Sequence, residues 1–252
     1  MEKIYLSVVI PCYDEMANLQ KGVLEKVSVF LRKKKYTFEV IIIDDGSKDG
    51  STEFIEHFLL ENKNVRLIKN SHTGKAGAVT SGMLRVKGEY ALFTDMDQAT
   101  PIEELDKLLP YQKQGYDIII GSRSIRRKGS PLSRIIMSRG VIILRKFIVG
   151  LSDISDTQCG FKMFKREVAH ELFGRINKIH NGFKNISGSS VTAGFDVELL
   201  YIAEKMQYKI KEVPVDWLYV ETRRVSPIKD SFEGLLELIT IRINALKGKY
   251  KV

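Results

Sequence analysis

Two short apolar runs of the chain each end in a cluster of acidic residues. Residues 40–43 are all β-branched aliphatic residues and lead to Asp45, and the apolar residues 91–93 lead to Asp95 and Asp97. Continuous apolar runs of this length are typical of strands that are buried on both faces of a parallel sheet. Open parallel sheets bind ligands at the carboxyl ends of their strands. The sequence therefore predicts an α/β protein with several carboxylates at one ligand-binding edge.

Strand and helix patterns alternate through the first half of the chain. Patterns typical of strands occupy residues 6–10, 40–43, 65–69, 90–94 and 117–121. Helical patterns occupy residues 19–34, 51–60, 75–85 and 102–109. This alternation predicts a doubly wound, mostly parallel sheet with flanking helices and right-handed crossovers. Beyond residue 121 we expect a further strand at 209–215.

Size and charge exclude some classes of protein. The chain has 252 residues, which suits one α/β domain, and a formal net charge of +9, which favours an anionic partner such as a nucleotide, a nucleic acid or anionic lipid. A nucleic-acid-binding protein is disfavoured, because no basic stripe interleaved with aromatic residues is present and the acidic clusters would have no purpose. Cys12 and Cys159 lack metal-ligand spacing and are expected to be free thiols in a reducing cytoplasm.

Asp95 and Asp97 form the sharpest candidate site. Side chains alternate along an extended segment, so both carboxylates are expected to point the same way. Two carboxylates on one side can hold Mg²⁺ or Mn²⁺ while substrate phosphates complete the coordination. An isolated Asp-x-Asp pair is common, and the signal here comes from acidic groups that follow three different apolar strands.

The other clusters allow both structural and functional interpretations. Pro11 ends the first strand, because proline donates no ladder hydrogen bond. After it, Tyr13 can stack on a base and Glu15 can bond to ribose or base, or the segment is a polar turn that begins a helix. Asp45 either binds a ligand or belongs to an acidic turn that caps the next helix.

Five motifs, in this order, resemble those of the A-fold (GT-A) glycosyltransferases of family 2. They are residues 7–15, 42–47, 94–97, 100–104 and 156–162. The last two narrow the resemblance to the dolichyl-phosphate glucose synthase branch, which is related to the dolichyl-phosphate mannose synthases. The resemblance implies metal-dependent, inverting transfer of a hexose from a nucleotide sugar to a polyprenyl phosphate. Glucose from UDP-glucose is favoured, and GDP-mannose is the alternative donor.

The resemblance also implies roles for individual residues. The donor-binding residues would be Pro11, Tyr13, Glu15, Asp45, Lys75, Asp95 and Asp97. The acceptor-binding residues would be Arg123, Gln158, Arg224 and Lys229. The metal ligands would be Asp95 and Asp97, and the catalytic residues Asp97, Arg123 and Asp196.

Several of these assignments have alternatives. Lys75 either touches the donor or begins a solvated helix. With a phosphate acceptor, which is already anionic, Asp196 would orient groups, whereas a soluble family 2 enzyme extending a polysaccharide or glycolipid would need Asp196 as a base. Glu198 is either functional or a structural acid at a helix start. Ala99 stands where mannose synthases have a metal-binding glutamine, with Gln98 one place earlier, so the third protein ligand is open.

The expected domain organisation is one GT-A catalytic domain at residues 1–230, followed by a C-terminal amphipathic helix at 231–252. Within the domain, residues 1–122 would bind the nucleotide sugar and residues 123–230 the acceptor. The expected helix at 231–246 has one apolar face, made of Phe232, Leu235, Leu236, Ile239, Ile243 and Leu246. That helix either packs on the domain or pairs with another chain.

Residues 131–149 predict a basic amphipathic helix. Its apolar face would contain Leu132, Ile136, Ile143 and Phe147, and its basic side Arg134, Arg139, Arg145 and Lys146. Such a helix either packs as a surface helix or lies in a membrane interface. A polyprenyl acceptor favours the interface. With no signal peptide, anchor or spanning segment in the sequence, we expect a cytoplasmic enzyme bound peripherally to the cytoplasmic face of a membrane.

Overall fold

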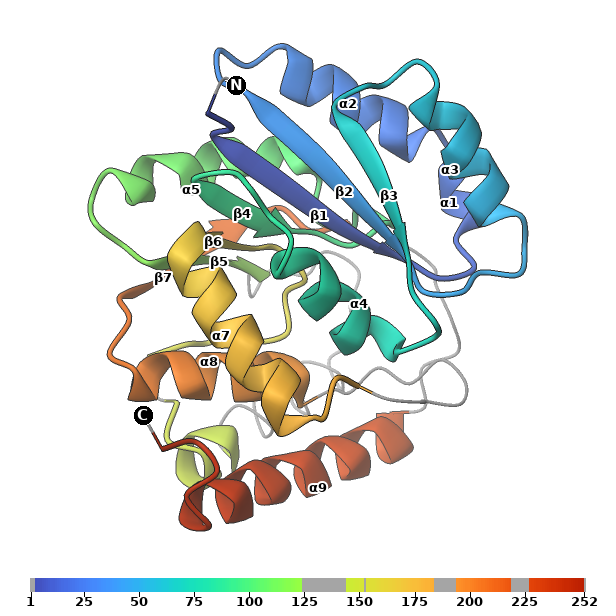
Figure 1. Ribbon diagram of the computed structural model, residues 1–252. Coiled ribbons are helices and arrows are strands. Elements are labelled where there is room, and N and C mark those ends of the chain that lie inside the picture. Colours follow the sequence, from blue (N-terminus) through green and yellow to red (C-terminus); the bar gives the residue numbers. More distant parts are fainter. Residues whose placement is uncertain (1–2, 124–143, 152, 184–193, 219–226, 252) are drawn as a thin grey trace.

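The computed structural model describes residues 3–123, 144–151, 153–183, 194–218 and 227–251. In these ranges a seven-stranded sheet is flanked by helices (Figure 1). The strands are β1 (Leu6–Cys12), β2 (Phe38–Asp44), β3 (Val65–Lys69), β4 (Tyr90–Phe93), β5 (Ile118–Arg123), β6 (Lys162–Lys165) and β7 (Ile210–Val215). The helices are α1 (Met16–Leu19), α2 (Val23–Arg32), α3 (Ser51–Leu59), α4 (Gly74–Met83), η1 (Ile102–Glu104), α5 (Leu105–Gln112), α7 (Arg166–Ile179), α8 (Phe195–Lys205) and α9 (Pro227–Leu246). The expected α/β architecture is confirmed.

The sheet is parallel apart from one inserted strand. Its order is β3-β2-β1-β4-β6-β5-β7, and every pair is parallel except those that β6 makes with β4 and β5. The sequence patterns did not predict β6, because it has only four residues and a lysine at each end. The insertion matters for function, since it separates the strand that carries the acidic pair from the strand that ends at Arg123.

Neighbouring residues of each central strand face opposite layers of helices. Ile41 and Ile43 of β2 belong to the hydrophobic cluster that also contains residues of α4, α7 and α8. Val40 and Ile42 belong to a second cluster, with residues of α2, α3 and α5. Because both faces of the strand are covered, every position in the run is apolar. This packing explains the continuous apolar runs in the sequence.

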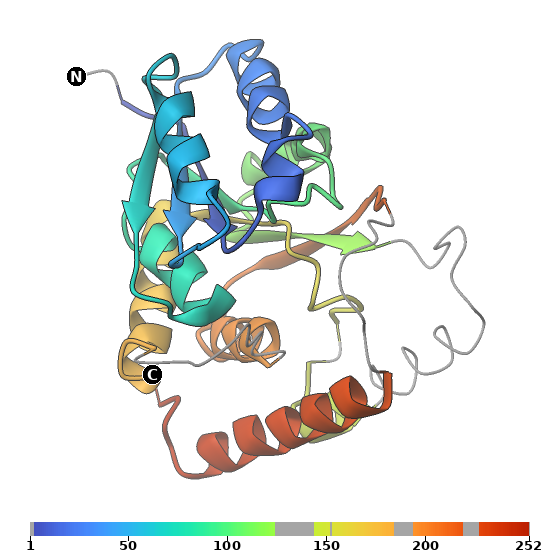
Figure 2. The ribbon, with the colours of Figure 1, turned by 90° about the vertical axis from the view of Figure 1, so that its right-hand side faces the viewer.

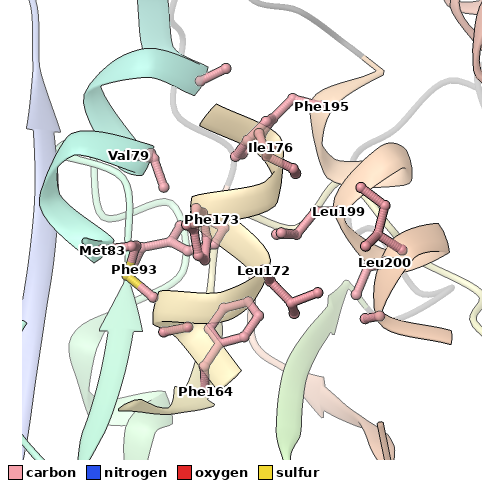
Figure 3. Packing of buried hydrophobic residues seen from close by; sticks show 14 of the residues in the cluster. Val79, Met83, Phe93, Phe164, Leu172, Phe173, Ile176, Phe195, Leu199 and Leu200 are labelled. Atoms are coloured by element: carbon pink, nitrogen blue, oxygen red, sulfur yellow. The ribbon is translucent and has the colours of Figure 1, made fainter. Parts of the chain in front are cut away.

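Aromatic rings fill the cluster against β4 and β6 (Figure 3). The ring centroid of Phe164 in β6 lies 6.1 Å from that of Phe93 in β4 and 5.5 Å from that of Phe173 in α7. Phe195, the first residue of α8, lies 6.2 Å from Phe173. Contacts between rings at these distances fix the position of the start of α8 against the sheet. The next residue of that helix, Asp196, is thereby placed at the sheet's ligand-binding edge.

The helix expected over residues 19–34 is interrupted by one turn. α1 ends at Leu19 and α2 begins at Val23, and between them Gly22 has a φ of +74°. Glycine adopts this left-handed conformation at little cost, whereas other residues do so rarely. Leu19 and Leu24 are both buried, so the apolar periodicity continues across the break and does not reveal it.

The C-terminal helix α9 packs on the domain through residues outside the expected apolar face. Leu238 and Ile241 are buried and join the cluster that contains α7 and α8. The expected face is largely solvent-exposed, with Leu236 at 47%, Ile239 at 41%, Ile243 at 44% and Leu246 at 74%. We call these four residues the α9 stripe. In both views α9 lies along one end of the molecule (Figures 1 and 2). Of the expected face, Phe232 lies outside the described side chains.

Most of the helix expected at 131–149 lies outside the described residues, but 144–148 are helical. The expectation that Arg145 is on an exposed basic face is wrong. Its guanidinium is buried, where it donates hydrogen bonds to Thr157 Oγ1 at 2.9 Å and to the Ile154 carbonyl. Phe147 is 83% exposed, as a lipid-facing or partner-facing residue would be. Among the helices described, none is both long enough and apolar enough to cross a membrane.

Candidate active site

The polar side chains converge at the carboxyl ends of the parallel strands. β1 lies between β2 and β4, and the chain passes from β1 to β2 and β3 on one side before crossing to β4 on the other. In an open α/β sheet this change of direction leaves a crevice at the strand ends, where ligands bind. The segments after β1, β2 and β4, which carry the predicted site residues, all meet there (Figure 1).

Asp95 and Asp97 follow β4 and lie next to a cation on α4. Lys75 Nζ lies 2.6 Å from Asp95 Oδ1. Burial raises the pKa of Asp97, although a hydrogen bond from the Ala99 amide lowers it, and the charge of Asp95 raises it further. The pKa of Lys75 is raised as well, because the charges of Asp95 and Asp196 outweigh the effect of burial. The pair therefore favours a positive charge beside it, and Lys75 supplies part of that charge.

Gln98 adds an amide to this segment. Its backbone has a φ of +48°, and its side-chain Nε2 donates to the Asp95 carbonyl at 2.9 Å. Its Oε1 is buried and, within the described residues, has no hydrogen-bond partner. Buried amide oxygens are normally paired, so an unpaired one beside two carboxylates is a candidate ligand for a hard cation. In the described part of the chain, three or more His, Cys, Asp or Glu side chains do not gather at any one metal site.

Asp45, at the end of β2, is engaged with the start of α4. Its carboxylate accepts hydrogen bonds from the Thr73 amide at 2.8 Å, the Thr73 hydroxyl at 2.7 Å and the Gly74 amide at 2.7 Å. His72 Nδ1 lies 3.1 Å from the same carboxylate. A carboxylate at a helix N-terminus stabilises the first turn. These contacts give Asp45 a structural role. Its role in binding a nucleotide stays a prediction.

Tyr13 and His72 form a pair of rings at the same edge. Their ring centroids are 4.4 Å apart, and the planes are inclined by 30°. Glu15 accepts a hydrogen bond from Asn18 Nδ2 at 2.6 Å, and Pro11, in β1, is half-buried. An aromatic ring at this edge of the sheet can stack on a nucleotide base. Sequence reasoning missed His72, although it lies just beyond β3 and therefore at the same edge of the sheet.

Arg123, at the end of β5, is held by Asp156. Its backbone amide and Nε donate to Asp156 Oδ2 at 2.9 and 2.7 Å, and Nη2 donates to Oδ1 at 2.8 Å. Burial raises the pKa of Asp156 and lowers that of Arg123. The hydrogen bonds and opposite charges of the pair together outweigh burial, so the pKa of Asp156 is lowered and that of Arg123 is raised. Gln158 is exposed, and its backbone amide donates to Asp156 Oδ1 at 3.2 Å. The pair fixes the direction of the guanidinium at the strand end.

Asp196 forms an ion pair with a buried lysine. Its Oδ1 is 2.5 Å from Lys162 Nζ, and its charge raises the pKa of both Lys75 and Arg123. Glu198, two residues later, points elsewhere: it bonds to His180 Nε2 at 2.6 Å and to the Tyr250 hydroxyl. These contacts favour the structural interpretation of Glu198, since they tie α8 to the C-terminal residues.

The structure does not describe the side chains of two predicted acceptor-binding residues. Arg224 lies outside the described residues, and Lys229 lies in α9 where the side chains are not described. Both expected thiols are free and buried. Burial raises the pKa of the Cys12 thiol to about 12, so the thiol is protonated near neutral pH.

Comparison with known proteins gives a consistent result. The model of the family "Glycosyl transferase family 2" matches residues 7–173. The chain is 33% identical to a dolichyl-phosphate beta-glucosyltransferase of Dictyostelium discoideum, over 100% of this chain and 78% of that protein. It is 31% identical to the Saccharomyces cerevisiae protein of the same name, over 99% and 78%.

Solved structures show the same fold. Glucosyl-3-phosphoglycerate synthase from Mycobacterium tuberculosis, in complex with Mn²⁺, UDP and glucosyl-3-phosphoglycerate, superposes with a TM-score of 0.60 at 16% identity, covering 96% of this chain and 79% of that one. The similarity supports the GT-A fold. With a family model that matches most of the chain and relatives that match nearly all of it, this protein belongs to glycosyl transferase family 2.

Proposed function

We propose that this protein transfers glucose from a nucleotide sugar to a dolichyl-type polyprenyl phosphate, with inversion at the anomeric carbon. The observation that carries the proposal is the arrangement of charge at one edge of the sheet. The acidic pair Asp95 and Asp97 suits a diphosphate with its cation, and Arg123 suits a second phosphate. The relatives named dolichyl-phosphate beta-glucosyltransferase support both the sugar and the acceptor.

For the donor, UDP-glucose is the favoured nucleotide sugar and GDP-mannose the alternative. Tyr13, Glu15 and Pro11 would line the base and ribose. Asp95 and Asp97 would hold Mg²⁺ or Mn²⁺, whose charge offsets the negative charge that develops on the leaving diphosphate. The Gln98 amide oxygen is a candidate further ligand. Lys75, close to Asp95, would contribute a second positive charge to the diphosphate.

For the acceptor, Arg123 would hold the phosphate, together with Gln158, Arg224 and Lys229. A phosphate monoester is already anionic near neutral pH, so it needs cations more than it needs a base. Arg123 is fixed by Asp156 with its guanidinium at the strand end. Asp196, paired with Lys162, would orient these groups. Residues 1–122 would thus form the donor half and 123–230 the acceptor half of one catalytic domain, with 231–252 appended.

Contact with a membrane would follow from a polyprenyl acceptor. The α9 stripe and Phe147 are exposed apolar groups, and the helical residues 144–148 lie beside α9 in both views (Figures 1 and 2). The exposed basic residues nearby in sequence are Lys146, Arg242, Lys247, Lys249 and Lys251. An apolar stripe next to basic groups suits an interface rich in anionic lipid. We propose that the protein binds peripherally, on the cytoplasmic face, through this surface.

A transfer assay tests the proposed function. Purified protein, a short polyprenyl phosphate and Mn²⁺ are incubated with radiolabelled UDP-glucose, UDP-N-acetylglucosamine or GDP-mannose, and the organic phase is counted. We expect label from UDP-glucose only, and none when the acceptor is the dephosphorylated polyprenol. Transfer to the polyprenol, or to a soluble glycan, would contradict the proposal and would require Asp196 to act as a base.

A further inference from the structure

Lys162, the first residue of β6, is a charged side chain enclosed in the core. It is 0% exposed. Its ammonium donates to the Cys159 carbonyl at 2.6 Å and to Asp196 Oδ1 at 2.5 Å, and it lies 5.2 Å from the centroid of the Phe93 ring. A lysine is almost never fully buried unless it is paired. Here the pairing is with the one carboxylate of α8 that reaches the active-site edge.

Packing alone gives no reason for a lysine at this position. Replacing a buried ion pair by apolar residues of similar volume is often neutral or stabilising, because desolvation of the charges offsets their attraction. The Phe93 ring beside the Lys162 ammonium belongs to the hydrophobic cluster, so these surroundings would accommodate an apolar side chain. A charge retained in such surroundings is more consistent with control of geometry than with a gain in stability.

The charge of Asp196 acts on two further cations of the site, because it raises the pKa of both Arg123 and Lys75. Asp95 contacts Lys75 at 2.6 Å, and the charge of Asp196 acts in turn on Lys75. Lys162 holds Asp196 from the core side. The carboxylate of Asp196 is therefore fixed at the active-site edge by a buried cation.

We infer that Lys162 is a positioning residue, which acts through Asp196 to keep the groups that bind the acceptor phosphate in place. The inference rests on the proposed function, in which Asp196 orients the groups that hold the acceptor phosphate. Lys162 itself would not touch the substrate, since its ammonium is enclosed. Its removal should therefore slow turnover and leave the affinity for the nucleotide almost unchanged.

The kinetic test combines Lys162→Met, Asp196→Asn and the double variant. We expect each single variant to lower kcat by about 10- to 100-fold, the range for misplaced active-site groups, while Kd for UDP with Mn²⁺ changes by less than about twofold. The double variant should be no slower than Asp196→Asn, because effects that act through one residue are not additive. Lys162→Arg, which keeps the charge, should recover part of kcat. Additive losses, or a loss confined to thermal stability, would overturn the inference.

Lys165→Met is the matched control. Lys165 lies at the other end of β6 and pairs with Asp117 at 2.7 Å, away from the site. Its replacement removes one lysine and one ion pair from the same strand, and we expect an unchanged kcat. If this variant slowed turnover as much as Lys162→Met, the effect would come from the strand and the positioning role would be wrong.

A spectroscopic test separates this inference from the proposed function. Lysine ammonium groups that are buried and hydrogen-bonded exchange slowly enough to give ¹H–¹⁵N signals. We expect one such signal that is lost in Lys162→Met, shifted in Asp196→Asn and retained in Lys165→Met. This measurement needs no acceptor substrate. If the signal is absent, the ion pair between Lys162 and Asp196 does not form, and the inference is wrong. A protein that gives the signal but transfers no glucose would contradict only the proposed function.

Discussion

Gly160 passes so close to Asp95 that a side chain would not fit between them. A β-carbon on Gly160 would fall 2.1 Å from Asp95 Oδ2. Atoms that are not bonded cannot approach to this distance, so any larger residue at position 160 would push the Asp95 carboxylate out of its present position. The position of Asp95 is therefore set partly from a residue 65 positions away in the chain.

Gly160→Ala should accordingly displace Asp95 and impair the enzyme. We expect kcat/KM to fall about 100-fold, as for other displacements of about 1 Å at an active site, with weaker metal-dependent binding of UDP. Steady-state kinetics and calorimetry measure the two effects. Gly174→Ala, in α7, is the control, because the nearest atom to its β-carbon is 4.0 Å away. Equal activity of the two variants would show that Asp95 tolerates the change.

Asp97→Ala should abolish metal-dependent transfer while the fold is retained. The pKa of Asp97 is raised by burial and by the charge of Asp95, so it protonates at higher pH than an ordinary aspartate. A protonated carboxyl is a poor metal ligand. In the wild type, Mn²⁺-dependent affinity for UDP should therefore weaken at mildly acidic pH, and circular dichroism should stay constant. Wild-type turnover by the alanine variant in excess chelator would refute a metal role.

Arg123→Ala should harm acceptor use more than donor binding. A phosphate monoester needs a charge-assisted donor, and Arg123 is fixed at the strand end for that purpose. We expect an increase of at least about tenfold in the apparent acceptor constant, the effect of losing ~1.4 kcal/mol of binding, with UDP affinity within about twofold. A large loss of UDP affinity would place Arg123 in the donor site instead.

Asp156→Asn should lower stability in a pH-dependent way. Removing one partner of a buried ion pair costs about 3–5 kcal/mol, and the partial exposure of Arg123 places the expected loss at the lower end. Arg123 lowers the pKa of Asp156, so the contribution is complete above the usual aspartate pKa of about 3.9 and is lost as the pH falls through the lowered value. In urea denaturation, the two proteins should converge as the pH approaches about 2.

The double variant Ile239→Ser, Ile243→Ser should weaken binding to membranes. Both residues belong to the exposed α9 stripe, so their replacement should not disturb the core. We expect less co-flotation with vesicles that contain anionic lipid, and unchanged transfer to a short, water-soluble acceptor. Wild-type flotation should decrease at high salt, because surface charge attraction is screened. Unchanged flotation of the variant would rule out the stripe as the membrane contact.

The architecture was predictable because it rests on local patterns. β3 was expected at residues 65–69 and forms there, and the acidic residues after β1, β2 and β4 meet at one edge because parallel strands end together. β6 was not predictable, because its stability comes from pairing with β4 and β5 rather than from its own four residues.

The details of the site depend on contacts that the sequence does not display. Asp45 was expected to bind a nucleotide, and the structure adds three hydrogen bonds to the start of α4. Lys162 was recognised only as part of the motif at residues 156–162, and its buried ion pair depends on α8, which comes later in the chain. Arg145 was misassigned because a helical periodicity does not show which basic residue finds buried carbonyls.

The antiparallel strand β6 has a consequence for how the protein is made. β4 and β5 are synthesised first, but they are separated in the sheet by a strand that begins at Lys162. Until that segment and β7 leave the ribosome, one edge of β4 and both edges of β5 are unpaired, and such edges readily associate with other chains. Completion of the sheet is thus a late step, and it joins the strand that carries the acidic pair to the strand that ends at Arg123.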